Sequence, residues 1–393
     1  MGERVIGLIS GTSVDGIDVA VADLRADGDE IVLTPLGALE VGYPEELRAA
    51  LLAALPPAPT TAEQLTKLDT RVGQAFAGAA GQGLDRFGPA DLVASLGQTV
   101  FHWVEDGHAR GTLQLGQPAW IAERTGLPVV ADLRARDVAA GGHGAPLAST
   151  LDRLWLRALA ESTGQPAVGL NIGGIANITV VQPDGTAIAY DTGPGNALLD
   201  LAAFRTTGRP RDENGELAAQ GEPDETLLRR LLAEPYYAAE PPKSTGKELF
   251  HAAYLDDVLP TTKPADLLAT LTELTARTIA DACARHGART VVASGGGVEN
   301  PALMRALAAN LSDARLVTSD ELGLPRAAKE AYLTALLGWL TWHGLPANVP
   351  SATGARGARL LGSITPGRTP LALPRPHTAT VTRLRVAAPQ PEE

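Results

Sequence analysis

The stretch RVIGLISGTSVDGIDVAVADL, residues 4–24, sets the class of fold expected for this chain. A run rich in Val and Ile predicts a buried strand, and the Gly, Thr, Ser and Asp residues after it predict a turn. A second alternating apolar run, closed by Asp-Gly at 27–28, predicts a returning strand and a further hairpin. Two hydroxyls and two carboxylates, Asp15 and Asp18 among them, are therefore expected at one strand-turn-strand tip.

Composition narrows the class of protein. The 393 residues are 45% hydrophobic, which is enough for two globular domains with buried cores. The net charge of −12 argues against a nucleic-acid partner, since such proteins concentrate Lys and Arg. The single cysteine, Cys283, excludes an intrachain disulfide and fits a reducing cytosol. No apolar run approaches the roughly 20 residues of a membrane span, and no secretory leader is recognisable, so we expect a cytoplasmic protein with no membrane partner.

Two segments of the chain also have similar sequence patterns. GLISG at 7–11 recurs as GLNIG at 169–173, and each is followed by an alternating strand that ends in Asp-Gly. Such short units also look alike by chance, but a separation of about 160 residues favours two related domains facing a cleft. We expect one domain at 1–135 plus about 345–366, a second at 136–344, and a disordered tail at 367–393, which is rich in Pro, Thr and Arg.

Helical and strand patterns alternate along the rest of the chain, so we expect an α/β fold. Amphipathic helices are predicted at 44–55, 62–84, 266–287 and 327–344. Strands are predicted at 91–102, where a Gly-Gln-Thr turn ends the strand, at the start of 127–147, and at 290–297, where three Gly residues end the strand.

Three glycine-rich turns follow predicted strands. They are SGTSVDG at 10–16, IGGIAN at 172–177 and SGGGVENP at 294–301. Such turns expose successive N–H groups that form a nest for phosphate oxygens. Each alone is equally typical of an ordinary tight turn, but the set favours a nucleotide site. None is a dinucleotide fingerprint or a P-loop.

Together with GQT, DVAAGGHGAPL, DTGPGN and PPKSTGKELF, these motifs resemble those of the anhydro-N-acetylmuramic acid kinases, in the same order and to about Pro366. The resemblance implies the actin-like, ribonuclease H-like ATPase fold, with two related domains of mixed sheets flanked by helices and a cleft between them. It implies an enzyme that opens a 1,6-anhydro amino sugar with water and phosphorylates its 6-oxygen from ATP, with Mg²⁺, in peptidoglycan recycling. It also implies a homodimer.

Asp191 is the candidate general base, because it ends the predicted strand TAIAY just before TGPGN. From the residues alone, capping of the turn explains Asp191 equally well, and the resemblance favours the base. Asp15 is the candidate Mg²⁺ ligand, with Asp18 as the alternative. The expected ATP-binding residues are Gly11, Thr12, Ser13, Val14, Asp15, Gly16, Ile17, Asp18, Gly173, Gly174, Asn177, Gly295, Gly296 and Gly297.

The small-molecule amino sugar needs a binding surface separate from that of ATP. Arg134 suits its lactyl carboxylate through a two-pronged contact, and Arg136 serves equally well. Glu330 is either a sugar contact or a solvated charge on a helix. The loop 241–248 is either a mobile cover or a surface loop with a helix cap. The expected sugar-binding residues are Gln98, Thr99, Arg134, Asp137, His143 and Glu330.

Three positions depart from the family pattern. Leu96 replaces a usual His, His143 replaces a usual Gln, and His251 replaces a common Asn. Two other functions share the nucleotide turns, namely a chaperone-like or filament-forming ATPase and another small-molecule kinase or phosphatase. The first would need a peptide-binding extension or self-assembly, and the second would not share both DTGPGN and PPKSTG.

Overall fold

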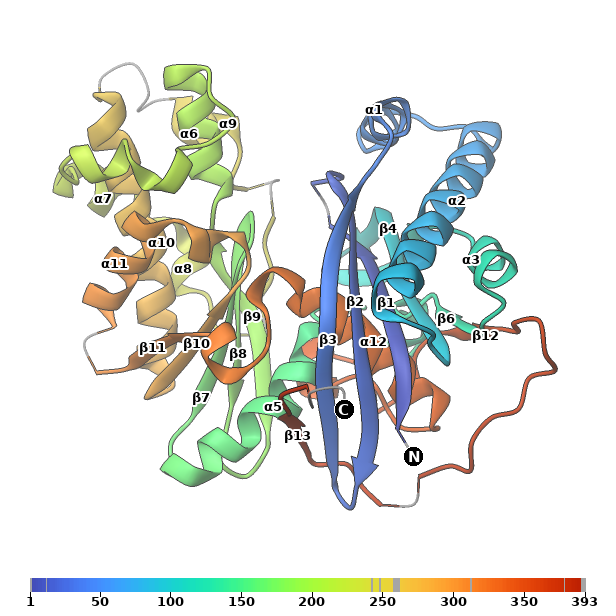
Figure 1. Ribbon diagram of the computed structural model, residues 1–393. Helices are drawn as coiled ribbons and strands as arrows, with labels where there is room; N and C mark the ends of the chain where they lie inside the picture. Colours follow the sequence, from blue (N-terminus) through green and yellow to red (C-terminus); the bar gives the residue numbers. More distant parts are fainter. Residues whose placement is uncertain are drawn as a thin grey trace. The chain divides into compact units, whose positions relative to one another are not determined.

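The computed structural model describes residues 2–11, 13–241, 243–246, 249–256, 262–311, 313–377 and 379–389. The chain divides into two compact units (Figure 1). Unit 1 comprises Met1–Trp155 and Ala328–Glu393, and unit 2 comprises Leu156–Ala327. Among the described residues, no helix has both the length and the apolar character needed to cross a bilayer.

Unit 1 is built on an eight-stranded mixed sheet with the order β12-β6-β4-β1-β2-β3-β13, and β5 pairs with β4. Strand β1 is antiparallel to β2 and parallel to β4. The strands are β1 (Glu3–Ser10), β2 (Gly16–Asp27), β3 (Glu30–Gly42), β4 (Leu92–Glu105), β5 (His108–Leu115), β6 (Val129–Ala131), β12 (Ser363–Thr365) and β13 (Arg383–Val386).

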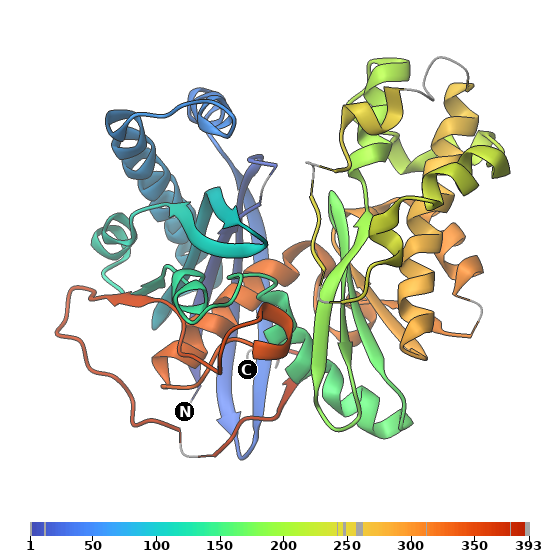
Figure 2. The same ribbon diagram turned by 180° about the vertical axis from the view of Figure 1, so that it is seen from behind.

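Helices cover both faces of this sheet. Alternate residues of β1 point to opposite faces, so Ile6 packs with Phe76 of α2 on one face. On the other face Gly7 meets Ala331 of α12, and Figures 1 and 2 show α2 and α12 on opposite sides of the strands. The helices of unit 1 are α1 (Glu45–Ala54), α2 (Ala62–Phe87), α3 (Pro118–Thr125), α4 (Ala135–Ala139), α12 (Lys329–Trp342) and α13 (Pro350–Thr353), and α5 (Ala148–Thr163) continues into unit 2.

Unit 2 repeats the sheet order of unit 1. Its order β9-β8-β7-β10-β11 corresponds to β3-β2-β1-β4-β6, with the same parallel and antiparallel pairings. The predicted α/β class with two related mixed sheets flanked by helices is therefore confirmed. The strands are β7 (Ala167–Ile172), β8 (Ile175–Val181), β9 (Ala187–Pro194), β10 (Thr290–Ser294) and β11 (Arg315–Thr318).

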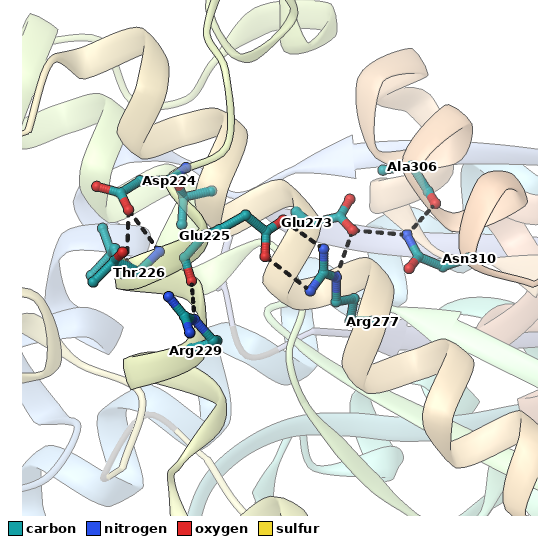
Figure 3. A network of polar contacts seen from close by, with 10 residues as sticks. Asp224, Glu225, Thr226, Arg229, Glu273, Arg277, Ala306 and Asn310 are labelled. Carbon is teal, nitrogen blue, oxygen red and sulfur yellow. Dashed lines mark hydrogen bonds and ion pairs between the residues drawn. The ribbon is translucent and has the colours of Figure 1, made fainter.

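A polar network joins three helices of unit 2 (Figure 3). Arg277 of α10 binds Glu225 of α7 and Glu273 of its own helix, each at 2.8 Å. Glu273 in turn accepts a hydrogen bond from Asn310 of α11. The helices of unit 2 are α6 (Ala197–Thr207), α7 (Glu225–Leu232), α8 (Pro235–Ala238), α9 (Ala252–Asp256), α10 (Pro264–Arg285) and α11 (Pro301–Asn310). Its 3₁₀ turns are η1 (Glu213–Gly215), η2 (Ala218–Gln220), η3 (Gly296–Glu299) and η4 (Asp320–Leu322), and η5 (Arg326–Ala328) reaches unit 1.

The domain boundaries expected at residues 136 and 345 differ from those observed. Residues 136–155 and 328–344 belong to unit 1, and α12 packs on β1, β2 and β4 of that unit. There Asp152 and Lys329 form a buried ion pair of 2.7 Å. The expectation of a disordered tail was wrong for Arg383–Val386, because this segment extends the sheet in parallel with β3.

Candidate functional site

The turn between β1 and β2 is closed by its own backbone. The Val14 N–H donates to Gly11 O at 3.2 Å, and the Ser10 hydroxyl lies 2.7 Å from Gly16 O. Val14 has φ of +58°, a strained conformation for a β-branched residue, and its fully buried side chain holds it there. The turn is therefore preorganised. Thr12, expected to bind ATP, lies outside the described residues.

Gln98 of β4 braces this turn. Its Nε2 donates to Gly11 O at 3.1 Å, and its Oε1 lies 2.6 Å from the Ser10 hydroxyl, which donates either to Oε1 or to Gly16 O. Gln98 has no exposed surface in this structure, and its expected contact with the sugar stays a prediction. The predicted end of the strand at Gly-Gln-Thr was also wrong, because β4 continues to Glu105, with a register shift after Thr99.

Asp15 is paired within the protein. Its Oδ1 lies 3.0 Å from Arg48 Nη2, and Arg48 Nε donates to Val14 O. In the part of the chain that the structure describes, no three His, Cys, Asp or Glu residues gather as a metal site. Ile17, like Val14, is fully buried, so neither side chain reaches a ligand and only their backbone groups remain as candidates.

Asp18 is partly buried and lies near two other carboxylates. Burial first, and then the charges of Glu40 and Glu330, raise its pKa from 3.8 to about 6. Glu40 is directly opposite Asp18 on β3, and Glu330 is in the first turn of α12. The charges of three carboxylates, Asp18, Glu40 and Glu330, therefore influence one another beside the turn. We call this group, which includes the expected sugar contact Glu330, the polar end of unit 1.

Arg134 and two histidines, His102 and His143, interact with one another nearby. Arg134 Nη1 donates to Gly144 O at 2.7 Å, burial lowers the pKa of Arg134, and Glu330 opposes that shift. Burial, followed by the charges of Arg134 and His143, lowers the pKa of His102. His102 was not predicted. It joins this group only because β4 continues beyond the turn expected to end it.

Asp137 is fully buried and serves the protein itself. Its Oδ1 accepts from Asn348 Nδ2 at 2.6 Å and from the Thr353 hydroxyl at 2.8 Å, and its Oδ2 accepts from Gly144 N–H at 2.8 Å. The structure therefore places Asp137 as the brace of the loop that carries His143, away from any exposed surface. Arg136, the alternative to Arg134, is exposed on α4.

The departures from the family pattern have local explanations. Leu96 is 3% exposed and belongs to the core, so it presents no group to a ligand. His251 Nδ1 accepts a hydrogen bond from Ala253 N–H at 3.2 Å, at the start of α9. Thr99 is half-buried, and its hydroxyl accepts from Gln114 Nε2 at 3.3 Å.

Asp191 of unit 2 lies within β9. Its direct neighbour in β8 is Asn177, whose own neighbour in β7 is Asn171. Directly opposed residues share a face, so these three polar side chains form a row across the sheet. The expectation that Asp191 ends its strand was wrong, because the ladder continues to Pro194. Asn171 was missed, since nothing in GLNIG distinguishes it from an ordinary strand residue.

The loop at 243–246 contacts Asp191 directly. The Ser244 hydroxyl donates to Asp191 Oδ2 at 2.8 Å, and the Thr245 N–H donates to the same oxygen at 3.0 Å. Asp191 N–H donates to Lys243 O at 3.3 Å, and the Tyr236 hydroxyl donates to Asp191 O at 2.7 Å. These hydrogen bonds join the described part of the loop to Asp191, and the mobile cover and the surface loop with a helix cap both stay predictions.

The two glycine turns of unit 2 are shaped by packing. The carbonyls of Gly173 and Gly174 accept hydrogen bonds from the DTGPGN segment that opens α6. Gly295 has φ of +84°, and a Cβ there would lie 2.5 Å from Asn171 Oδ1. A Cβ on Gly297 would lie 2.3 Å from the Ile172 side chain, whereas one on Gly296 would meet no atom within 4 Å. No other atom of the described protein therefore covers the side of the Gly296 backbone on which a Cβ would stand.

Two mixed sheets of matching order, each with a polar glycine turn after its first strand, are the arrangement of the actin-like, ribonuclease H-like fold. A sequence model of the anhydro-N-acetylmuramic acid kinase family matches residues 3–367. The anhydro-N-acetylmuramic acid kinase of Streptomyces avermitilis is 58% identical over 94% of this chain and 96% of that relative. The enzyme of the same name from Streptomyces coelicolor is 55% identical over 98% of this chain and 99% of that relative.

The chain therefore belongs to the anhydro-N-acetylmuramic acid kinase family and is a kinase. Among solved structures, a ROK family glucokinase from Streptomyces griseus in complex with glucose and AMPPNP covers 86% of this chain and 99% of that chain. It does so at 14% identity with a TM-score of 0.39. The family assignment rests on the sequence relatives and not on this structural likeness.

Proposed function

We propose that this kinase opens 1,6-anhydro-N-acetylmuramic acid with water and phosphorylates it from ATP. The water oxygen bonds to the anomeric carbon as the bond from that carbon to O6 breaks. The freed O6 bonds to the γ-phosphorus, the bond from the γ-phosphorus to the bridging oxygen breaks, and ADP leaves. The products are N-acetylmuramic acid 6-phosphate and ADP, as peptidoglycan recycling requires. The observation that carries the proposal is the positioned carboxylate of Asp191 in a chain of this family.

In this proposal Asp191 takes the proton from the attacking water, since a positioned carboxylate is suited to general-base work. Arg134 pairs with the lactyl carboxylate of the sugar, and Glu330, His143, Thr99 and the newly identified His102 line the same polar end of unit 1. Gln98 and Asp137 act indirectly. Gln98 holds the turn between β1 and β2, and Asp137 holds the loop that carries His143.

ATP is assigned to the glycine turns. Gly11 and Gly296 support this assignment, because a Cβ at either position would meet no atom of the protein closer than 3.7 Å. The fold itself therefore does not require glycine there, whereas close approach of a nucleotide to the backbone does. The expected contacts of Gly173, Gly174 and Asn177 with phosphate remain part of this proposal.

Mg²⁺ fits Asp18 better than Asp15. Asp15 already has Arg48 as its cation. The pKa of Asp18 is raised by burial first and then by the charges of Glu40 and Glu330, and a divalent cation would offset that negative charge. When bound, Mg²⁺ neutralises charge on the phosphates of ATP. We propose Asp18 as the carboxylate nearest to that ion, and we further propose a cytoplasmic homodimer.

Incubation with Mg-ATP and 1,6-anhydro-N-acetylmuramic acid in oxygen-18 water tests the reaction. Mass spectrometry should find one added phosphate and one labelled oxygen in the sugar product. Asp191→Asn keeps the shape and removes the base, so it should abolish turnover while ATP affinity stays within about twofold. ATP consumption without this product would move the proposal to another substrate, and no consumption by the wild type would overturn the kinase reaction.

A further inference from the structure

Two hydrogen bonds from the loop at 243–246 reach the same carboxylate oxygen of Asp191. The hydroxyl of Ser244 and the backbone N–H of Thr245 both donate to Oδ2, at 2.8 and 3.0 Å. Two donors on one oxygen restrict rotation of the carboxylate, and hydrogen bonds to the charged form favour ionisation. A carboxylate that is held in one orientation has the geometry that a general base needs.

Lys243 fixes the loop that carries both donors. Its Nζ donates to the carbonyls of Tyr236 and Tyr237, at 2.9 and 3.1 Å, and lies 4.7 Å from the centre of the Tyr236 ring. Its partial burial and the nearby charge of Arg285 lower its pKa, while Glu240 opposes this shift. This half-buried lysine therefore anchors the loop through two backbone carbonyls and one aromatic ring.

The anchor and the base share one support. Tyr236 packs edge-on against Phe250, Tyr237 stacks on the same ring, and a Cβ on Gly193 of β9 would lie 2.8 Å from Tyr237. The Tyr236 hydroxyl also donates to the carbonyl of Asp191. The aromatic cluster that receives Lys243 thus also holds the strand segment that carries the base.

We propose that Lys243, Ser244 and Thr245 form a clamp that orients the Asp191 carboxylate, with Ser244 and Thr245 as positioning residues and Lys243 as their anchor. This inference rests on the proposed function, in which Asp191 is the base. It gives the PPKSTG segment a role in the hydrolytic half of the reaction. Among the residues that the structure describes, the charged and titratable groups around this clamp include Lys243, Tyr190, Tyr236, Tyr237, Arg285 and Glu240.

The test compares pH profiles of kcat/KM. Ser244→Ala removes one donor, so the pKa of Asp191 should rise and the acid limb should move up by about one pH unit. Below the new pKa the rate should fall about tenfold, with the KM for ATP unchanged. Ser244→Thr retains the hydroxyl and should restore the profile. Lys243→Met removes the anchor of both donors and should move the limb further.

Ser162→Ala is the matched control, because the exposed Ser162 hydroxyl donates only to Leu159 O in α5. It should leave the profile unchanged. A profile of Ser244→Ala that superimposes on the wild type overturns the clamp, as does an equal loss of rate at every pH in both Ser244 variants. Full activity in Asp191→Asn would instead overturn the assignment of the base, so the two failures are distinguishable.

Discussion

At the scale of single residues, the partly buried carboxyl of Asp18 lowers the stability of the folded chain at neutral pH. Its folded-state pKa of about 6 lies above the ordinary value of 3.8. Between these values the folded chain retains a proton that the unfolded chain has released. The free energy of unfolding therefore falls as the pH rises through this window, and the loss persists above it. A carboxylate kept at such a cost is typical of a site that binds a cation.

Asp18→Asn removes this charge from the crowded group. The free energy of unfolding at pH 7 should rise by about 1–2 kcal/mol, after allowance for the part of Asp18 that remains in solvent. In this variant the free energy of unfolding should no longer fall between about pH 4 and 6. Urea unfolding across this range measures both effects, while the KM for Mg-ATP should rise. Asp27→Asn, at the exposed end of β2, is the control and should leave the wild-type pH dependence in place. Identical pH profiles for Asp18→Asn and the wild type would contradict the prediction.

At the scale of elements, the position of Glu330 depends on how α12 packs on the first sheet. A Cβ on Gly7 would lie 2.0 Å from Ala331 O, and one on Gly338 would lie 2.4 Å from the Ala94 Cβ. The helix and the sheet therefore approach so closely that only glycine fits at these two crossings. Because Ala331 directly follows Glu330, this contact also sets where the carboxylate beside Asp18 lies.

Gly7→Ala should push α12 away from the sheet. Backbone cannot move aside as a side chain does, so we expect a loss of about 3 kcal/mol in the free energy of unfolding. Activity should fall in the fraction that remains folded. Gly78→Ala is the control, since Gly78 lies in α2 with no atom within 4 Å of a new Cβ. It should stabilise the chain by about 0.5–1 kcal/mol. Equal effects of the two substitutions in urea unfolding would refute the packing argument.

At the scale of the whole molecule, the β4–β5 hairpin exposes an apolar face. Phe101 is 49% exposed and Trp103 is 48% exposed. Leu113, directly opposite Phe101, is 38% exposed. Large exposed side chains that gather on one surface are typical of protein interfaces. This hairpin is therefore the surface that we assign to the proposed homodimer.

Trp103→Glu should convert a dimer into a monomer, because it places a charge in the centre of an apolar contact. Multi-angle light scattering at micromolar concentration would show the mass halved, with the melting temperature little changed. Trp120→Glu, on α3, changes an exposed tryptophan outside the hairpin and should remain dimeric. A wild type that is monomeric would refute the dimer, and a dimeric Trp103→Glu would refute this interface.

Local patterns in the sequence were sufficient for the α/β class, the repeated strand-turn-strand units and the three glycine turns, because hydrophobic periodicity and turn chemistry are properties of neighbouring residues. They also located Asp191, although its interpretation required the family motifs. The same patterns could not show that Gln98 and Asp137 are buried, since polar residues at a strand end or after an arginine look alike whether they face a ligand or the protein.

Contacts between distant segments were decided by tertiary structure alone. The pairing of Arg383–Val386 with β3, the crowding of Asp18 by Glu40 and Glu330, and the inclusion of His102 each join residues far apart in the chain. The hydrogen bonds from Ser244 and Thr245 to Asp191 do so as well. Such contacts depend on how strands order themselves and helices pack, and no local pattern encodes that arrangement.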